Sequence, residues 1–198
     1  MKIAPVFECC ILKPVTLLAE VDQVCIDAQE NKYRAVCVPP LFVKHTKNLL
    51  KGTPVLTATA VGFPFGYSAI EAKLAEAVLA MVDGADEIEL VINTCALKNA
   101  DWQYLAREVN TIMPVIKSKG LVLKVIIETA LLTNEEMITC CDIYGAAGVD
   151  YVKTSTGFSK KQTSIETIVL FRKHLADQVK IVAMVTGAGH GSAVPVSW

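Results

Sequence analysis

The sequence has few histidines and almost no net charge: its 198 residues include three histidines, and the formal net charge is −1. Nucleic acids and anionic membranes usually bind clustered Lys and Arg, so this balance argues against both as partners. Charges or prolines interrupt every apolar run before it could span a membrane or resemble a signal peptide. These features predict a cytoplasmic protein that binds neither nucleic acid nor membrane.

Motifs for metal ions and disulfides are missing as well. The three histidines, His45, His174 and His190, are far apart, and the seven cysteines include two adjacent pairs but no Cys-x-x-Cys. Neither a zinc site nor a disulfide framework is indicated, and we expect no metal or other cofactor. Most of the cysteines are expected to be small buried residues.

The sequence is rich in apolar residues, at 53%, and no linker or low-complexity stretch divides it, which predicts one domain over residues 1–198. Apolar runs typical of strands alternate with segments of helical period. The expected strands are 7–12, 33–38, 54–61, 86–93, 121–128, 149–154 and 179–185, and the expected helices are 18–29, 41–50, 68–81, 102–117, 133–144 and 164–175. Ser68 and Glu71 have the spacing of a capping box at the start of the third helix.

This alternation is typical of a parallel α/β protein, and two architectures compete. A doubly wound sheet would have a Gly-rich nucleotide-binding turn after its first strand, where this chain has Lys13-Pro14-Val15-Thr16. A (β/α)8 TIM-type barrel places polar residues at the C-terminal ends of several strands, as this sequence does. The barrel is therefore the expected fold.

Three consecutive strands direct a charge to one interior. Side chains alternate along a strand, so if the fully apolar face meets the helices, then Glu89, Lys124 and Lys153 point into the barrel. From spacing alone, an internal salt-bridge network and a site with shifted pKa values are equally good interpretations, and both can hold together. The loops at 62–66 and 154–158, which follow two of the strands, favour a site.

The chemistry expected of such a cluster is that of a lysine nucleophile. An amine attacks carbonyl groups only when it is neutral, and burial or a nearby cation lowers its pKa. Lys124 is expected to supply that cation for Lys153, which would form a Schiff base and so promote cleavage or formation of an adjacent carbon–carbon bond. Glu89 would transfer protons, and no metal is required.

Four segments carry a resemblance to a known family. Residues 61–66 (VGFPFG), 84–93 (GADEIELVIN), 124–129 (KVIIET) and 150–158 (DYVKTSTGF) resemble deoxyribose-phosphate aldolase, a class I aldolase with a (β/α)8 barrel. The resemblance covers roughly residues 7 to 180. It implies reversible cleavage of 2-deoxy-D-ribose 5-phosphate to D-glyceraldehyde 3-phosphate and acetaldehyde, with a phosphorylated sugar as the small-molecule partner.

The resemblance also assigns residues. Lys153 falls on the family's Schiff-base lysine, and Glu89 falls on its proton-relaying aspartate. Cys37 falls on a cysteine common near the family's site, although a core thiol is the favoured interpretation here. Thr154, Thr156 and Gly157 are implied to bind substrate, with the backbone around Thr156 and Gly157 holding its phosphate.

The chain departs from the family pattern at three places. Position 89 is Glu rather than Asp, and residues 8–14 read ECCILKP, where the family usually has a sequence like DHTLLKP. On the seventh strand, Val182 occupies the place of a lysine that lowers the pKa of the Schiff-base lysine in the family. Lys180 shares its face but lies about 6.6 Å deeper along the strand, too far for an equal substitute.

The C-terminal sequence predicts a barrel that lacks its last strand and helix. Residues 186–198 match neither the family nor a regular period, and a divergent, disordered tail is favoured over a phosphate-cradling loop. An aberrant terminus from a shifted reading frame or a truncated gene is a further interpretation. Open strand edges would reduce stability or be closed by a neighbouring chain, and a homodimer is one expectation.

Two functional alternatives to the aldolase remain. One is a catalytically impaired or inactive barrel remnant that only binds a phosphorylated ligand, which the loss of the seventh-strand lysine motivates. The other is a transaldolase-like Schiff-base enzyme, which fits the lysine but not the surrounding motifs.

Overall fold

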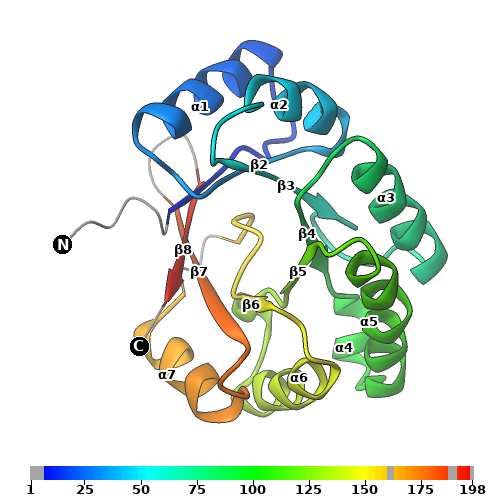
Figure 1. The fold of residues 1–198 in the computed structure, drawn as a ribbon. Helices are drawn as coiled ribbons and strands as arrows, with labels where there is room; N and C mark the ends of the chain where they lie inside the picture. The colour runs from blue at the N-terminus through cyan, green and yellow to red at the C-terminus, as the bar shows by residue number, and fades with distance from the viewer. Residues whose placement is uncertain (1–6, 160–162, 187–190, 197–198) are drawn as a thin grey trace.

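The protein forms a closed barrel surrounded by helices. The computed structural model describes residues 7–159, 163–186 and 191–196, and within them eight strands close in the order β1 to β8 (Figure 1). The strands are β1 (Glu8–Cys10), β2 (Ala35–Val38), β3 (Leu56–Val61), β4 (Glu87–Val91), β5 (Val122–Ile126), β6 (Tyr151–Lys153), β7 (Lys180–Thr186) and β8 (Gly191–Val196). The helices are α1 (Leu18–Glu30), α2 (Val43–Leu49), α3 (Ile70–Val82), α4 (Thr94–Lys98), α5 (Trp102–Lys117), α6 (Asn134–Ala147) and α7 (Ile165–His174). The predicted TIM-barrel type of fold is confirmed.

Alternation along the strands separates two cores. In β2, Val36 and Val38 face outward and belong to the large apolar core between the barrel and its helices. Cys37 faces inward and belongs to a small cluster inside the barrel, whose buried members are Cys10, Cys37, Ala58, Tyr151, Val182 and Met184. Because side chains on a strand alternate with a period of two, neighbouring residues of β2 belong to different cores. The inner core is small, which leaves room in the barrel for the charged residues described below.

Several helices begin where the sequence supplies a capping side chain. Thr133 and Glu136 form a capping box at the start of α6, and the side chain of Ser164 accepts a hydrogen bond at the start of α7. The capping box predicted for Ser68 and Glu71 is wrong, because α3 starts later and Ala69 occupies its N-cap position. The short helix α4 was not expected from the sequence.

The eighth strand closes the barrel in the opposite direction to the others. Strands β1 to β7 run parallel in sequence order, whereas β8 pairs antiparallel with both β7 and β1. The last parallel strand of the pattern is therefore missing, as predicted, and within the described residues no helix follows β8 (Figure 1). The expectation of an open edge, or of closure by a neighbouring chain, is wrong because the chain's own β8 fills the gap. Within the predicted tail 186–198, Gly191–Val196 form β8, and residues 187–190 and 197–198 lie outside the described residues.

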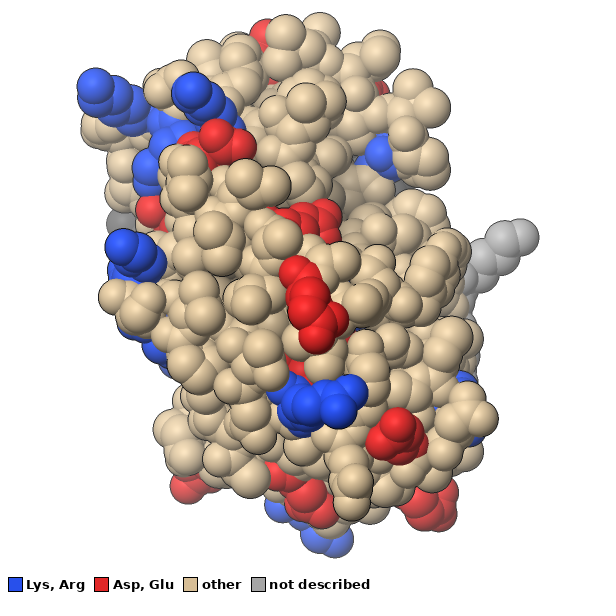
Figure 2. All heavy atoms as spheres, turned by 90° about the vertical axis from the view of Figure 1, so that its right-hand side faces the viewer, with Lys and Arg blue, Asp and Glu red and all other residues tan. Residues whose placement is uncertain are grey.

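The charges on the outer surface are mixed. On the face shown in Figure 2, Lys and Arg side chains are interspersed with Asp and Glu among uncharged residues, without a large patch of one sign. Within the described residues, none of the helices combines the length and apolar character that crossing a bilayer requires.

A buried ion pair connects two helices of the outer layer. Lys73 Nζ on α3 lies 2.7 Å from Glu108 Oε1 on α5 and donates a second hydrogen bond, of 2.8 Å, to the carbonyl of Val91 at the end of β4. Both side chains are almost completely buried. Burial lowers the pKa of Lys73 and raises that of Glu108, and each partner opposes this effect on the other. Each charge of this buried pair therefore depends on the other for its neutralisation.

We expect Glu108→Ala to destabilise the protein by about 3–5 kcal/mol, because it leaves the ammonium of Lys73 buried and unpaired. Urea unfolding of the two proteins measures the difference. The control is Lys98→Ala, which removes a partly exposed pair with Glu136 and should cost about 1 kcal/mol or less. Equal losses in the two variants would contradict the expected role of burial.

Candidate active site

One ammonium group occupies the centre of the barrel interior. Lys124 Nζ lies 2.6 Å from Glu8 Oε1, 2.7 Å from Glu87 Oε2 and 3.4 Å from Glu89 Oε1. All four side chains are buried. They come from inward-facing positions of β1, β4 and β5, and Glu89 is directly paired with Lys124 in the register of β4 and β5. The predicted inward direction of Glu89 and Lys124 is therefore what the structure has.

Arg34 completes this network from the N-terminal end of the barrel. It lies just before β2, and its guanidinium forms ion pairs with Glu8 and Glu87. It also stacks over the ring of Tyr151, with 5.5 Å between the guanidinium carbon and the ring centroid. Sequence reasoning missed Arg34 and Glu8 as parts of the cluster. The inward alternation from Cys10 to Glu8 could have identified Glu8, but no periodic pattern identifies a residue that precedes a strand.

Lys153 lies one layer closer to the mouth of the barrel. Its Nζ is 2.6 Å from Glu89 Oε2 and 3.5 Å from Cys10 Sγ. Glu89 thus bridges the two lysines, with one carboxylate oxygen toward each. The structure brings Glu89, Lys124 and Lys153 together, as the alternation predicted.

The two ammonium groups determine the charge of Glu89. Burial raises its pKa, but the charges of Lys153 and Lys124 outweigh this effect and hold the pKa at about 2. Glu89 is therefore a carboxylate at neutral pH. A carboxylate in direct contact with an ammonium can accept a proton from it without a mediating group.

The pKa of Lys153 differs from the expectation. Burial disfavours its charged form, but the interactions with Cys10 and with the Glu89 carboxylate outweigh burial and raise the pKa well above its usual value. Lys124 was expected to lower this pKa, but the three carboxylates around Lys124 neutralise its charge and raise its own pKa as well. The resting amine of Lys153 is therefore protonated, and it must lose a proton before it can act as a nucleophile.

Two thiols lie beside the amine. Cys10 and Cys37 are directly paired in the register of β1 and β2, and both are buried inside the barrel. The hydrogen bond from Cys37 lowers the pKa of Cys10, while the same bond and burial raise the pKa of Cys37 well above its usual value. Cys37 is thus a buried thiol and also a neighbour of the site, so the two interpretations from the sequence are compatible. Cys10, which sequence reasoning did not select, is the thiol in contact with Lys153.

Strand β7 places a valine next to Lys153. In the register of β6 and β7, Val182 pairs with Lys153 and Lys180 pairs with Tyr151. Lys180 is exposed, and its Nζ lies 5.3 Å from the centroid of the Tyr151 ring. Lys180 therefore lies at the level of Tyr151, two residues below Lys153 along the strand. The predicted deeper position of Lys180 is what the structure has.

Glu128 holds the loop after β6. It belongs to the 124–129 motif, but sequence reasoning did not identify it as a site residue. The Glu128 carboxylate accepts hydrogen bonds from the Ser155 hydroxyl at 2.9 Å and from the Thr156 N–H at 3.0 Å, as well as from the Thr156 hydroxyl. The N–H of Gly157 donates to Ser155 Oγ at 3.0 Å. The N–H groups of Thr156 and Gly157, which the resemblance assigned to a phosphate, thus have partners within the protein.

Thr154 also has partners within the protein. Its Oγ1 accepts hydrogen bonds from the Met184 N–H at 3.1 Å and from the Thr163 hydroxyl at 2.7 Å. Its buried side chain therefore connects β6 to β7 and points to the opposite face of the strand from Lys153.

The glycines of the loop after β3 are required for packing. A Cβ on Gly66 would lie 1.7 Å from the Ile92 carbonyl oxygen, and one on Gly62 would lie 2.7 Å from Cε of Lys73. Both residues have positive φ angles, of 69° and 68°. The sequence analysis took the loop at 62–66 to favour a site, whereas the close neighbours of its glycines found here belong to the protein.

A pocket of about 300 Å³ lies at the C-terminal ends of the strands. Its lining is Leu12, Lys13, Pro14, Pro39, Pro40, Ala60, Phe63, Pro64, Glu76 and Phe158. Leu12 packs against the inner cluster that contains Cys10 and Val182, and Ala60 pairs with Glu89 in the register of β3 and β4. The pocket therefore lies at the end of the barrel where TIM barrels carry their active sites, although neither Lys153 nor Glu89 lines it.

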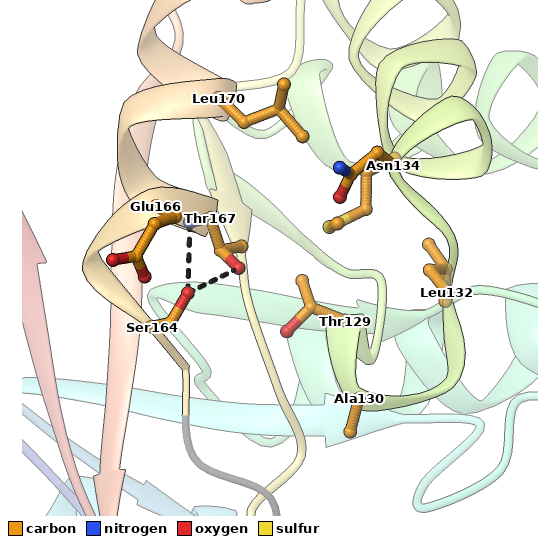
Figure 3. A pocket seen from close by; sticks show the side chains of 9 residues that line it. Thr129, Ala130, Leu132, Asn134, Ser164, Glu166, Thr167 and Leu170 are labelled. Carbon is orange, nitrogen blue, oxygen red and sulfur yellow. Dashed lines mark hydrogen bonds between the residues drawn. The ribbon is translucent and has the colours of Figure 1, made fainter.

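A second pocket, of about 250 Å³, lies outside the barrel between α6 and α7 (Figure 3). The hydroxyls of Thr129, Ser164 and Thr167 and the amide of Asn134 line it. Ser164 Oγ accepts a hydrogen bond of 3.3 Å from the Thr167 N–H as the cap of α7. None of the residues assigned to the Lys153 site lines this pocket. Within the part of the chain that the structure describes, no group of three or more His, Cys, Asp or Glu residues could hold a metal ion.

Sequence comparison identifies the family. The sequence pattern of the DeoC/LacD family of aldolases matches residues 7–191. The chain belongs to this family. A deoxyribose-phosphate aldolase of Caldanaerobacter subterraneus subsp. tengcongensis is 40% identical over 184 residues, which are 92% of this chain and 80% of the relative.

Solved structures of aldolases have the same fold. The aldolase QR15 has a TM-score of 0.85 and 31% identity, and the match covers 91% of this chain and 80% of QR15. The tetrameric deoxyribose phosphate aldolase from Aeropyrum pernix has a TM-score of 0.80 and 26% identity over 88% of this chain and 73% of that one. The predicted resemblance and enzyme class, an aldolase of the aldehyde-lyase type, are confirmed. The homodimer and the cytoplasmic location stay predictions.

We expect the ionised carboxylate of Glu89 to stabilise the fold in a defined pH window. Its folded pKa of about 2 lies below the unfolded value of about 4.3, so its contribution is complete above pH 4.3 and is lost as the pH falls toward 2. Urea unfolding at several pH values should show a smaller loss of stability across this window for Glu89→Gln than for the unchanged protein.

The control is Glu71→Gln, which changes an exposed carboxylate of α3 and should keep the pH dependence of the unchanged protein. Parallel acid curves for all three proteins would show that Glu89 is not held ionised by Lys153 and Lys124.

Proposed function

We propose that this chain is a class I aldolase that cleaves 2-deoxy-D-ribose 5-phosphate to D-glyceraldehyde 3-phosphate and acetaldehyde through a Schiff base on Lys153. The observation that carries the proposal is the contact of 2.6 Å between Lys153 Nζ and Glu89 Oε2, both of which are buried inside the barrel. The family assignment supports it, since relatives named deoxyribose-phosphate aldolase are about 40% identical.

The contact between Lys153 and Glu89 supports the proton transfers of this reaction. Glu89 accepts a proton from the Lys153 ammonium, and the neutral amine attacks the aldehyde carbon C1 of the open-chain sugar to give a carbinolamine. Glu89 returns the proton to the carbinolamine hydroxyl, which leaves as water, and the resulting iminium ion withdraws electrons from the bond between C2 and C3. Glu89 then takes the proton of the C3 hydroxyl, that bond breaks, and D-glyceraldehyde 3-phosphate leaves. Glu89 gives this proton to C2 of the enamine, and water hydrolyses the iminium ion, which releases acetaldehyde and the Lys153 ammonium.

We expect incubation with acetaldehyde and sodium borohydride to leave one ethyl group on Lys153, because reduction traps the iminium ion. Intact-mass and peptide mass spectrometry measure the adduct. It should be absent in Lys153→Ala and present in Lys180→Ala, which removes an exposed lysine of the same barrel. Folded protein without an adduct at Lys153 would exclude the proposed chemistry.

A second candidate is a remnant that binds a phosphorylated ligand without turnover. The observation that favours it is Val182, which stands beside Lys153 in a register position where the family's pattern has a lysine. The raised pKa of Lys153 supports it too. Cleavage of 2-deoxy-D-ribose 5-phosphate at any pH would exclude this candidate, and thermal protection by the ester without cleavage would support it.

A cation at position 182 tests whether the missing positive charge keeps Lys153 protonated. In Val182→Lys, the added ammonium should lower the pKa of Lys153 and increase the rate of ethyl-adduct formation near neutral pH, by about tenfold for each unit of pKa. The rate of adduct formation measured against pH gives both quantities. Val182→Met is the uncharged control and should keep the original pH profile. Circular dichroism checks that each variant is folded, and a profile unchanged by the lysine would contradict this account of Lys153.

A further inference from the structure

Glu128 and Ser155 form the next inward layer of the barrel above Lys153. In the register of β5 and β6, Lys153 is paired with Ile126. Two residues further along the same face of each strand are Glu128 and Ser155, about 6.6 Å closer to the C-terminal end of the barrel. An aldehyde that enters from this end, where TIM barrels carry their active sites, passes this layer before it reaches the amine.

The Glu128 side chain fixes the start of the loop that follows β6. One carboxylate oxygen accepts the Ser155 hydroxyl at 2.9 Å, and the other accepts the Thr156 N–H at 3.0 Å and the Thr156 hydroxyl. These two hydroxyls in turn accept the N–H groups of Gly157 and Phe158, at 3.0 Å and 3.2 Å. The residues that provide the three side chains are at most 6% exposed. One buried carboxylate thus determines the path of residues 155–158.

The backbone of Glu128 has a conformation that residues with a side chain usually avoid. Its φ angle is 50°, in the left-handed region that glycine adopts without strain. Within the described residues, the other non-glycine residues with positive φ, Lys32 and Ala100, lie in exposed turns, whereas Glu128 is buried. A strained and buried residue at the rim of a site indicates that its side chain has a function there.

The backbone on both sides of Glu128 is bonded to the end of β6 independently of the carboxylate. The Ile127 N–H donates to the Lys153 carbonyl at 3.1 Å, and the Thr129 N–H donates to the Thr154 carbonyl at 2.8 Å. These bonds hold the backbone of Lys153 when the Glu128 side chain is removed. Such a change should therefore leave the amine in place and alter the loop above it.

We propose that Glu128 is a positioning residue for the Schiff-base reaction, which holds Ser155 and Thr156 so that the approach to Lys153 stays open. The inference rests on the proposed Schiff-base function of Lys153. Glu128 acts through the loop and takes no part in proton transfer. Without its carboxylate, the buried donors of Ser155 and Thr156 need other partners, and the loop changes its path over the amine. A displacement of about 1 Å near a reacting group can reduce the rate about a hundredfold.

The test compares two substitutions of Glu128. Glu128→Ala loses all three hydrogen bonds, whereas Glu128→Gln keeps an oxygen that can accept from Thr156. The rate constant for trapping acetaldehyde on Lys153 with borohydride is measured against pH, together with kcat and KM for 2-deoxy-D-ribose 5-phosphate. We expect Glu128→Ala to lower the trapping rate constant and kcat/KM by about tenfold to a hundredfold without shifting the pH profile, and Glu128→Gln to recover most of the loss.

Urea unfolding of each variant separates this role from a purely structural one. A residue that only stabilises the fold would change the unfolding curve and leave the trapping rate constant of the folded protein as it was. The matched control is Glu136→Gln on α6, which changes another carboxylate that accepts a backbone N–H, that of Thr133 at 2.8 Å. It should leave the trapping rate constant and kcat/KM unchanged.

Ser155→Ala tests the same contact from the other side, and it serves even if Glu128→Ala does not fold. It should lower the trapping rate constant in the unchanged protein. Combined with Glu128→Gln, its further effect should be smaller, because the two residues act through one shared hydrogen bond. Fully additive effects of the two substitutions would overturn the inference.

The remaining outcomes separate the inference from the proposed function. Slower trapping in folded Glu128→Ala, with recovery in Glu128→Gln, supports the inference. Equal trapping rate constants in folded Glu128→Ala and in the unchanged protein, or a shifted pH profile, overturn the inference and leave the proposed function intact. An unchanged, folded protein that forms no adduct on Lys153 overturns the proposed function and the inference with it.

Discussion

The interior of this barrel depends on one buried ammonium group, that of Lys124, and on the carboxylates around it. Removing a charge from water costs several kcal/mol unless a partner compensates it, and Lys124 compensates Glu8, Glu87 and Glu89 at once. The three carboxylates come from β1 and β4, so the bonds also connect strands that are not neighbours in the sheet. A change at Lys124 would therefore affect the closure of the barrel and the charge of Glu89 together.

Glu89 belongs both to the ion-pair network around Lys124 and to the contact with Lys153. One of its oxygens belongs to the network around Lys124, and the other contacts Lys153. Both contacts keep the carboxylate ionised, and the second also places it directly against the amine. In the chain as it stands, the same carboxylate also favours the protonated amine, and Val182 supplies no opposing charge. The site thus holds Lys153 in its protonated, non-nucleophilic state at rest.

Much of this arrangement could be predicted from the sequence, for a simple physical reason. Once the outer face of each strand is assigned to the helices, a period of two leaves one possible direction for Glu89, Lys124 and Lys153. The parts that could not be predicted do not follow a period. Arg34 reaches the network from a position before its strand, and the hydrogen bonds of Glu128 depend on a backbone with positive φ at that residue. The segment 191–196 contains Pro195, which argues against a strand, and only its pairing with β7 and β1 identifies it as β8.

The reversed direction of β8 has a consequence for how the barrel is assembled. Strand β8 follows β7 closely in the chain and pairs with it from Gly191 to Val196, whereas it meets β1 only from Gly191 to Ala193. The first of these seams is local in sequence, and the second joins the two ends of the chain. Bringing such distant segments together carries a large loop-closure entropy, and few backbone bonds offset it here. We therefore expect the pairing between β1 and β8 to form last when the barrel folds, and to be the first strand pairing to open under destabilising conditions.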